Sequence, residues 1–283
     1  MKFGVREICD VTFKALQSGY LGSMPVAKGQ PVLYIDSAKT STIEGAATTV
    51  YAQGGKGNSR LIAWEGEKTL TFTVEDALLS PIGFAILSGA GLYDVSKLNK
   101  TALVHYTSVT TLDAKGQPTI EGTAAQDSAM FVLEYTDGSI GNVLKAEEIT
   151  PDEGEKYMSY GEPGKSVFVD YYVEKTAGVT ELNIDAANFA GYYYVEASTL
   201  FRRESDGADL PAEIVFPKVK IQSNFTFNMA STGDPSTFTF TMDAFPAYTY
   251  FNQDKKVLCA MQIIDESVAA EEAKVDNSAV LVK

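Results

Sequence analysis

The sequence predicts a mainly β protein: an antiparallel β-sandwich or barrel with one short flanking helix at residues 81–89 and long loops. Short runs in which apolar and polar residues alternate recur along the chain, and turns rich in Gly, Pro, Asp and Ser separate them. The clearest example is residues 220–245, where alternating arms at 220–228 and 237–243 flank a turn. Each arm has Phe on one face and Ser, Thr or Asn on the other, which is typical of a β-hairpin in a sheet that packs on one side only.

Length and composition indicate a globular chain. Its 283 residues are 45% hydrophobic, which is enough for a sizeable core in one large domain or two smaller ones. No run of about 18 apolar residues occurs, and charges interrupt residues 1–14 where a signal peptide needs an apolar stretch, so we expect synthesis in the cytoplasm. The 23 basic and 37 acidic residues give a net charge of −14, which argues against a surface that grips DNA, although soluble acidic proteins commonly carry such a charge.

The N-terminal part contains two predicted strands and a long connection. Residues 3–15 alternate as a strand, and residues 32–35 begin a second. Residues 36–59 are rich in Ser, Thr, Ala and Gly and end in Gly-Gly-Lys-Gly-Asn-Ser, which predicts either a long hairpin with a flexible tip or an extended loop. Loops of this length in a compact domain are commonly functional or disordered, so we expect this one to become ordered on a partner.

The predicted helix follows a further strand at residues 68–75. Pro81 suits a first helical turn, Ser80 can cap the N-terminus of the helix, and Gly89 or Gly91 can end it.

The middle of the chain alternates strands with turn-rich spacers. The spacer at residues 147–164 is acidic and rich in Gly and Pro, which indicates an exposed segment. We therefore predict a main β-domain formed by residues 1–112 and 165–265, a possible inserted elaboration at 113–164, and a C-terminal arm at 266–283. Further predicted strands lie at 102–112, 129–135, 166–174, 180–184, 192–203, 212–219 and 257–263.

Residue patterns for chemistry are weak, so we expect no enzyme activity, no cofactor and no metal. Residues 159–166 end in Gly-Lys-Ser like a phosphate-binding loop, but the alternation after them predicts a strand where that loop needs a helix. His105 is the only histidine, and the sequence places no nucleophile or carboxylate beside it. Cys9 and Cys259 fall on apolar strand faces and are interpreted as buried small hydrophobes rather than as a disulfide.

Three segments, residues 51–89, 191–203 and 212–246, resemble major tail tube proteins of tailed bacteriophages. This resemblance implies a β-sandwich with a flanking helix that forms six-membered rings, stacked into a hollow tube through which the genome passes. It also implies a place in the virion tail after assembly in the host cytoplasm. The implied partners are further copies of the chain and other tail proteins (a sheath if the tail contracts, tape measure, baseplate and terminator), with DNA passing unbound and no membrane contact. Residues 113–164 match less well and would be an elaboration on the outer wall.

The resemblance also implies roles for particular residues. The loop at residues 46–60 would correspond to a long hairpin or loop that reaches the adjacent ring. The hairpin at 220–245 would line or back the lumen, with small uncharged side chains facing away from the core, so that acidic residues for the lumen must come from elsewhere. Arg202 and Arg203 are candidates for ion pairs between subunits. The candidate loop residues are Thr48, Val50, Tyr51, Gln53, Lys56, Arg60 and Trp64, and the candidate lumen residues are Gln222, Asn224, Thr226, Thr237, Thr239 and Thr241.

Two other classes of protein fit the composition. A capsid decoration protein, or another β-rich virion protein, would share the acidic character but form trimers or monomers on a shell. A carbohydrate-binding or surface-binding β-sandwich module would use aromatic side chains such as those of Tyr192, Tyr193 and Tyr194, although a β core and subunit contacts also explain this cluster.

Overall fold

The computed structural model describes residues 2–265, except 95–97, 99, 126–129, 153, 185, 228, 230, 234 and 235. The C-terminal arm predicted at 266–283 lies outside the described residues. Antiparallel strands make up most of the described chain, and its one helix lies where the sequence predicts it, so the mainly β fold class is confirmed.

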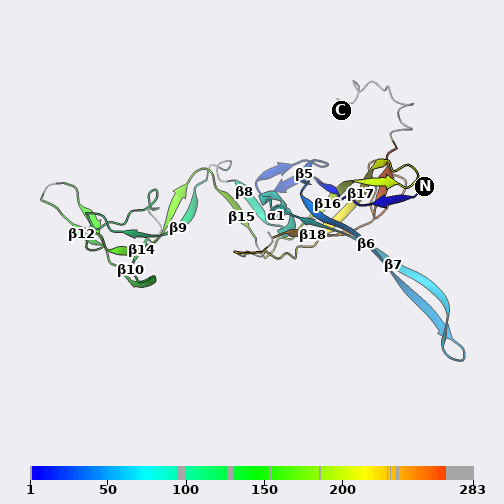
Figure 1. Ribbon diagram of the computed structural model, residues 1–283, viewed down its shortest axis with the longest axis horizontal. Helices are drawn as coiled ribbons and strands as arrows, with labels where there is room; N and C mark the ends of the chain where they lie inside the picture. Colours follow the sequence, from blue (N-terminus) through cyan, green and yellow to red (C-terminus); the bar gives the residue numbers. More distant parts are fainter. Residues whose placement is uncertain are drawn as a thin grey trace, which may run out of the picture. The chain divides into compact units, whose positions relative to one another are not determined.

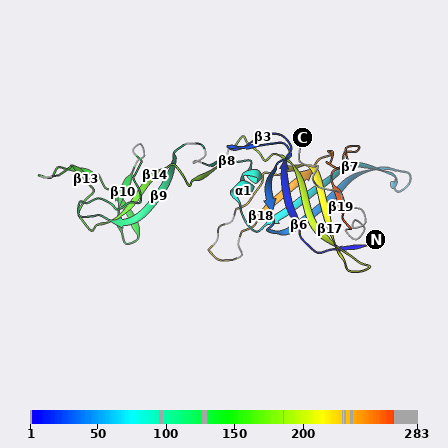
Figure 2. The same cartoon turned by 90° about the horizontal axis from the view of Figure 1, so that it is seen from above.

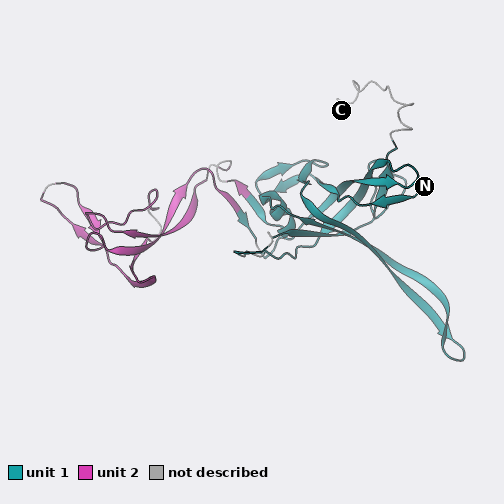
Figure 3. Cartoon of the chain, in the orientation of Figure 1, with its two compact units in different colours: residues 1–92, 182–283 teal, residues 93–181 magenta. Residues whose placement is uncertain are grey.

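The chain divides into two compact units (Figure 3). Unit 1 contains residues 1–92 and 182–283, and unit 2 contains residues 93–181. The inserted unit is therefore wider than the predicted segment at 113–164. The reason is that β9 (Ala102–Thr111) and β14 (Ser166–Lys175), which flank that segment, pair with each other along their full length and belong to the insertion.

Unit 1 is built on a nine-stranded antiparallel sheet (Figure 1). The strand order is β5-β2-β16-β17-β18-β7-β6, with β1 beside β16 and β19 beside β17. One short hairpin, β3 (Gly19–Leu21) with β4 (Met24–Val26), accompanies the sheet, and β8 (Gly91–Asp94) pairs with β15 (Thr180–Asn183) in a separate two-stranded sheet. The strands of the sheet are β1 (Phe3–Val5), β2 (Asp10–Ala15), β5 (Pro31–Ile35), β6 (Ala38–Gly54), β7 (Ser59–Asp76), β16 (Tyr192–Arg203), β17 (Asp209–Ile221), β18 (Phe238–Ala244) and β19 (Ala260–Ile263).

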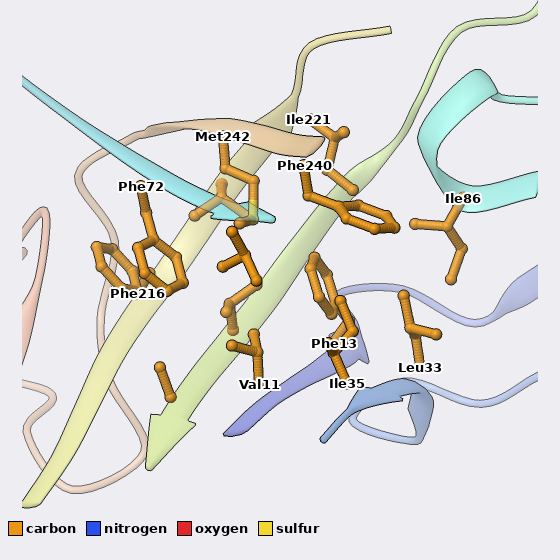
Figure 4. Packing of buried hydrophobic residues seen from close by; sticks show 14 of the residues in the cluster. Val11, Phe13, Leu33, Ile35, Phe72, Ile86, Phe216, Ile221, Phe240 and Met242 are labelled. Carbon is orange, nitrogen blue, oxygen red and sulfur yellow. The ribbon is translucent and has the colours of Figure 1, made fainter. Parts of the chain in front are cut away.

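The core of unit 1 forms because the sheet curves round its own apolar face. Phe13 on β2 contacts Phe240 on β18 with ring centroids 5.8 Å apart, although these strands are not neighbours in the sheet. Phe72 stacks on Phe216 at 4.7 Å. Figure 4 shows these rings and the neighbouring aliphatic side chains pointing into one interior. Burying each such side chain contributes about 1.5–3 kcal/mol.

Helix α1 (Pro81–Ser88) packs against this core through Ile86 and Leu87. The Ser80 hydroxyl accepts the Gly83 N–H at 3.0 Å, and Pro81 occupies the first turn. Gly89 ends the helix in the left-handed conformation with φ 73°. The predicted cap residues therefore fix both ends of the helix.

Unit 2 contains a four-stranded sheet in the order β11-β10-β14-β9 and a separate hairpin of β12 (Glu147–Ile149) with β13 (Tyr157–Ser159). Its other strands are β10 (Phe131–Thr136) and β11 (Ser139–Val143). One face of the sheet buries a second core. The Gly-Lys-Ser sequence leads directly into β14, and Lys165 pairs with Glu134 at 2.7 Å, so the prediction of a strand in place of a phosphate loop is confirmed.

The hairpin predicted at residues 220–245 is only partly correct. Its second arm is β18, but β17 ends at Ile221, and the two strands pair only over Val219–Ile221 and 242–244. Residues 222–227 are not a strand, because Phe225 turns to pack edge-on against Phe84 of α1, with centroids 5.0 Å apart. Phe225 and Phe227, predicted to lie in the core, are half exposed.

Candidate functional site

The β6–β7 hairpin is longer than the sheet that supports it. Its strands pair from Ala38 and Asp76 to Gly54 and Ser59, with register shifts along the way. Residues 36–59 were predicted to form either a long hairpin with a flexible tip or an extended loop. The structure shows a hairpin whose strands are paired up to the turn at residues 55–58. Positive φ angles at Gly55, Gly57 and Asn58 close that turn.

The outer half of this hairpin projects from unit 1 (Figures 1 and 2). Pairing between β7 and β18 stops at Thr71, so beyond Leu70 the two strands pair only with each other. We call residues 46–69 the distal hairpin.

One face of the distal hairpin is apolar. Val50 lies opposite Trp64, and Ala52 lies opposite Ile62, which places all four side chains on the same face. Val50, Ile62 and Trp64 are 64%, 55% and 53% exposed. These four residues form what we call the distal apolar face. A contiguous apolar patch on a projecting arm is typical of a surface that binds another protein.

The other face of the distal hairpin is polar and aromatic. The Arg60 guanidinium lies over the Tyr51 ring, 4.1 Å from its centroid. Asn58 donates a hydrogen bond from Nδ2 to Oε1 of Gln53 at 3.2 Å. Lys56 lies exposed in the turn. The structure thus brings Val50 together with Trp64, and Tyr51 together with Arg60, from the predicted set of loop residues.

A β-bulge marks the start of the distal hairpin. Thr48 on β6 lies opposite two residues of β7, Gly66 and Glu67, because the register shifts between Ala47 and Thr49. The Thr48 hydroxyl accepts the Glu67 N–H at 2.9 Å. A Cβ atom at Gly66 would lie 2.5 Å from Thr48 Oγ1, so this close approach requires glycine.

A second surface covers the outward face of β6, β7 and β18. Three cross-strand rows lie side by side there, because the registers of the two strand pairs match. All nine side chains carry a hydroxyl or a carboxylate, and we call this surface the hydroxyl–carboxylate face. The rows are Thr40–Glu75–Thr239, Thr42–Thr73–Thr241 and Glu44–Thr71–Asp243.

Two carboxylates of this face, those of Glu75 and Asp243, accept hydrogen bonds from neutral side chains and not from basic ones. Thr40 and Thr237 donate hydroxyl hydrogen bonds to Glu75 at 3.3 and 2.5 Å. Thr71 and Gln222 donate to Asp243, the shortest distance being 3.1 Å. Because no lysine or arginine pairs with these carboxylates among the described residues, the face keeps its negative charge.

Four of the six predicted lumen residues belong to the sheet or bond to it, and two do not. Thr239 and Thr241 lie on the hydroxyl–carboxylate face, and Thr237 and Gln222 bond to its carboxylates. Asn224 and Thr226 lie in the irregular segment that leaves the sheet. Sequence reasoning missed Glu44, Glu75 and Asp243, which place carboxylates on the same face as Thr239 and Thr241. Apolar and polar residues alternate along β7, and this pattern could have placed Glu75 on the face opposite to the buried Phe72 and Val74.

Arg202 and Arg203 bind carboxylates of their own chain. Arg202 makes two hydrogen bonds of 2.6 Å with Asp209. Arg203 pairs with Asp206 at 2.6 Å and with Asp265 at 2.5 Å. The Arg203 guanidinium lowers the pKa of Asp206 to about 2. These pairs tie the β16–β17 turn to the end of the described chain.

The described residues include both cysteines and the single histidine of the chain, together with many carboxylates. No group of three or more His, Cys, Asp and Glu side chains there is arranged to hold a metal. Cys9 and Cys259 are free thiols, and burial raises the pKa of Cys259 to about 11. His105 Nε2 lies 2.8 Å from Asp170 in unit 2, a carboxylate that the sequence did not place there. The described helix has eight residues, too few to cross a membrane.

Comparison with models of protein families places the chain in a known family. The model of the YomU/Tube protein family matches residues 24–257. This range includes the distal hairpin, all of unit 2 and the hydroxyl–carboxylate face. The match confirms the resemblance to phage tail tube proteins drawn from the sequence. A search of curated proteins found no match.

Proposed function

The chain belongs to the YomU/Tube protein family as a structural tube protein of a phage tail, and we propose that it forms six-membered rings that stack into the hollow tube through which DNA is ejected. The observation that carries this proposal is the distal hairpin. A monomer gains nothing from an exposed arm whose apolar face carries the chain's only tryptophan. In a stack, the arm reaches the next ring and buries that face.

The arm and the sheet that bears it favour a head-to-tail assembly. A contact between unlike surfaces of identical subunits produces a ring where the rotation closes and an open tube where it does not. β6 is an edge strand of the sheet, and its backbone groups on the side away from β7 can pair with another strand. Pairing of this edge with a neighbouring subunit would continue the sheet round a ring.

In this assembly the hydroxyl–carboxylate face lines the lumen. Its threonines are small, and its carboxylates have no basic partners among the described residues, so it repels phosphate and does not bind it. A basic side chain that contacts a phosphate releases counterions, which favours DNA binding. A face without such contacts lacks this contribution. Six copies of the face would therefore let DNA slide.

The remaining partners follow from this role. A tail tube is assembled in the host cytoplasm and contacts other tail proteins, which include a tape measure, a baseplate, a terminator and, in a contractile tail, a sheath. The role requires no catalysis and no cofactor.

Negative-stain electron microscopy of the purified protein, with sedimentation in parallel, tests the proposal. We expect six-fold rings, or tubes with a regular axial repeat, whose fraction rises with protein concentration. Trimers would contradict the proposal and favour a capsid decoration protein. A monomer that persists at high concentration and binds saccharides would favour a carbohydrate-binding module.

A further inference from the structure

Unit 1 contains an open groove of about 650 Å³ at one end of its sheet. The groove lies where β2 ends, β16 begins and β17 approaches its own end, and the β3–β4 hairpin forms one wall. Tyr20 is 78% exposed and Tyr192 is 45% exposed. The principal lining residues are Leu16, Tyr20, Leu21, Tyr192, Tyr193 and Lys218.

We propose that this groove receives the distal apolar face of the hairpin from a second copy of the chain in the adjacent ring. The inference rests on the proposed function and names the surface on which the hairpin docks. Trp64 and Ile62 would enter between the tyrosine rings, and Val50 would lie beside them.

The placement of the two surfaces supports a contact between copies. The groove lies at the end of β16 and β17 that contains Tyr192 and Lys218. The registers of β17 with β18 and of β18 with β7 direct the distal hairpin the other way, towards the end of β17 where Asp209 lies. Figures 1 and 2 show the hairpin projecting from the unit. A chain thus directs its hairpin away from its own groove. Two surfaces at opposite ends of one unit are the arrangement that head-to-tail stacking requires.

The chemistry of the groove matches that of the hairpin. Its walls are apolar and aromatic, and a tryptophan anchored in such a pocket is a common source of binding energy at protein interfaces. Tyrosine rings provide rigid contact area and retain a polar hydroxyl at the rim.

Charge provides a second match. Lys218 and Lys220 stack on the Tyr192 ring at 4.6 and 5.0 Å from its centroid. Neither lysine pairs with a carboxylate among the described residues, although the chain carries a net charge of −14. The distal hairpin carries Glu67 at the bulge that borders the distal apolar face, and this residue has no basic partner in the described part of the chain. Docking would place its carboxylate near Lys218, which lines the groove.

Intermolecular disulfide formation tests the contact. The full-length variant Val50→Cys is mixed with the full-length variant Tyr20→Cys, assembled, and oxidised mildly. Trp64 remains in both variants. We expect a disulfide-linked dimer whose tryptic peptides join positions 50 and 20. The matched control is Thr49→Cys, because residue 49 neighbours residue 50 in the strand but points to the opposite face. Each variant alone controls for the native thiols of Cys9 and Cys259.

Trp64 offers an independent readout, since it is the only tryptophan of the chain. Its emission should shift to shorter wavelength on assembly of the unmodified protein, and Tyr192→Ala should reduce that shift. Tubes that form without the 50–20 disulfide, or with equal cross-linking from position 49, would overturn the docking proposal and leave the proposed function intact. A protein that forms neither rings nor tubes would overturn both, and electron microscopy distinguishes these two results.

Discussion

The two halves of the β6–β7 hairpin share their strands but not their surroundings. In the proximal half, β7 pairs with β18 as well as β6, and Phe72 and Val74 are fully buried. In the distal half the strands pair only with each other, and Val50 and Trp64 are more than half exposed. Both halves alternate in sequence. The proximal half therefore contributes to the stability of the fold, whereas the distal half contributes only a surface.

The largest effect on stability should come from the proximal half. Phe72→Ala removes a ring that stacks on Phe216 in the core, and we expect the free energy of unfolding to fall by about 3–5 kcal/mol. Urea denaturation followed by circular dichroism measures this change. Trp64→Ala is the matched variant from the distal half, for which we expect a change within about 0.5 kcal/mol. Equal destabilisation by the two variants would contradict the comparison.

Assembly should respond in the opposite order. Trp64→Ala removes the largest side chain of the distal apolar face, and we expect the critical concentration for tube growth to rise by about 30-fold or more. Sedimentation across a dilution series measures this concentration. Lys56→Ala, at the tip of the same hairpin and outside the apolar face, is the control and should assemble like the unmodified protein. An unchanged critical concentration in Trp64→Ala would show that the apolar face is not a contact.

The bulge that joins the two halves should have an intermediate effect. The Cβ of Gly66→Ala would meet Thr48 Oγ1 and displace the hydroxyl that accepts the Glu67 N–H, which changes the direction of the distal hairpin. We expect a several-fold rise in the critical concentration and a change in unfolding free energy below about 1 kcal/mol.

The control for the bulge is Gly45→Ala in the same hairpin. Its Cβ would meet only Leu70 Cδ1, at an ordinary contact distance of 3.7 Å. Tubes that form equally well from both alanine variants would mean that the angle of the distal hairpin is unimportant.

The smallest effect should come from the ion pairs at the far end of β16 and β17. The pKa of Asp206 is lowered to about 2, so its pair with Arg203 stabilises the fold fully above the ordinary pKa of aspartate and loses this effect as the pH falls towards 2. Between pH 5 and 8, we expect the thermal midpoint of Asp206→Asn to vary with pH as that of the unmodified protein does. Below about pH 4, we expect the variant to lose less stability than the unmodified protein. A difference that develops between pH 5 and 8 would argue against this assignment.

Local signals in the sequence were sufficient where a residue acts on its own neighbours. Ser80, Pro81 and Gly89 set the ends of α1 through their own backbone groups, and the sequence predicts that helix correctly. The alternation after Lys165 likewise predicts β14, because a strand shows the period of two wherever one face is more buried than the other.

Contacts between distant segments were not predictable in this way. Residues 222–227 alternate like a strand, but Phe225 meets α1, and no local pattern reveals that competing surface. The row Glu44–Thr71–Asp243 depends on two registers that join segments far apart in the sequence. Similarly, the limits of unit 2 follow from the pairing of β9 with β14, whereas the periodicity of each strand says nothing about its partner.

Removal of the distal hairpin tests whether this arm is required for assembly and not for folding. Ala46 and Thr69 face each other in the ladder, so residues 47–68 can be replaced by Asn-Gly, which closes a two-residue turn. The shortened chain and the unmodified chain are then compared by thermal unfolding and by electron microscopy at the same concentration. We predict the same thermal midpoint for both chains, with tubes from the unmodified chain and none from the shortened one. Tubes of normal axial repeat from the shortened chain would show that the distal hairpin is not a contact between rings.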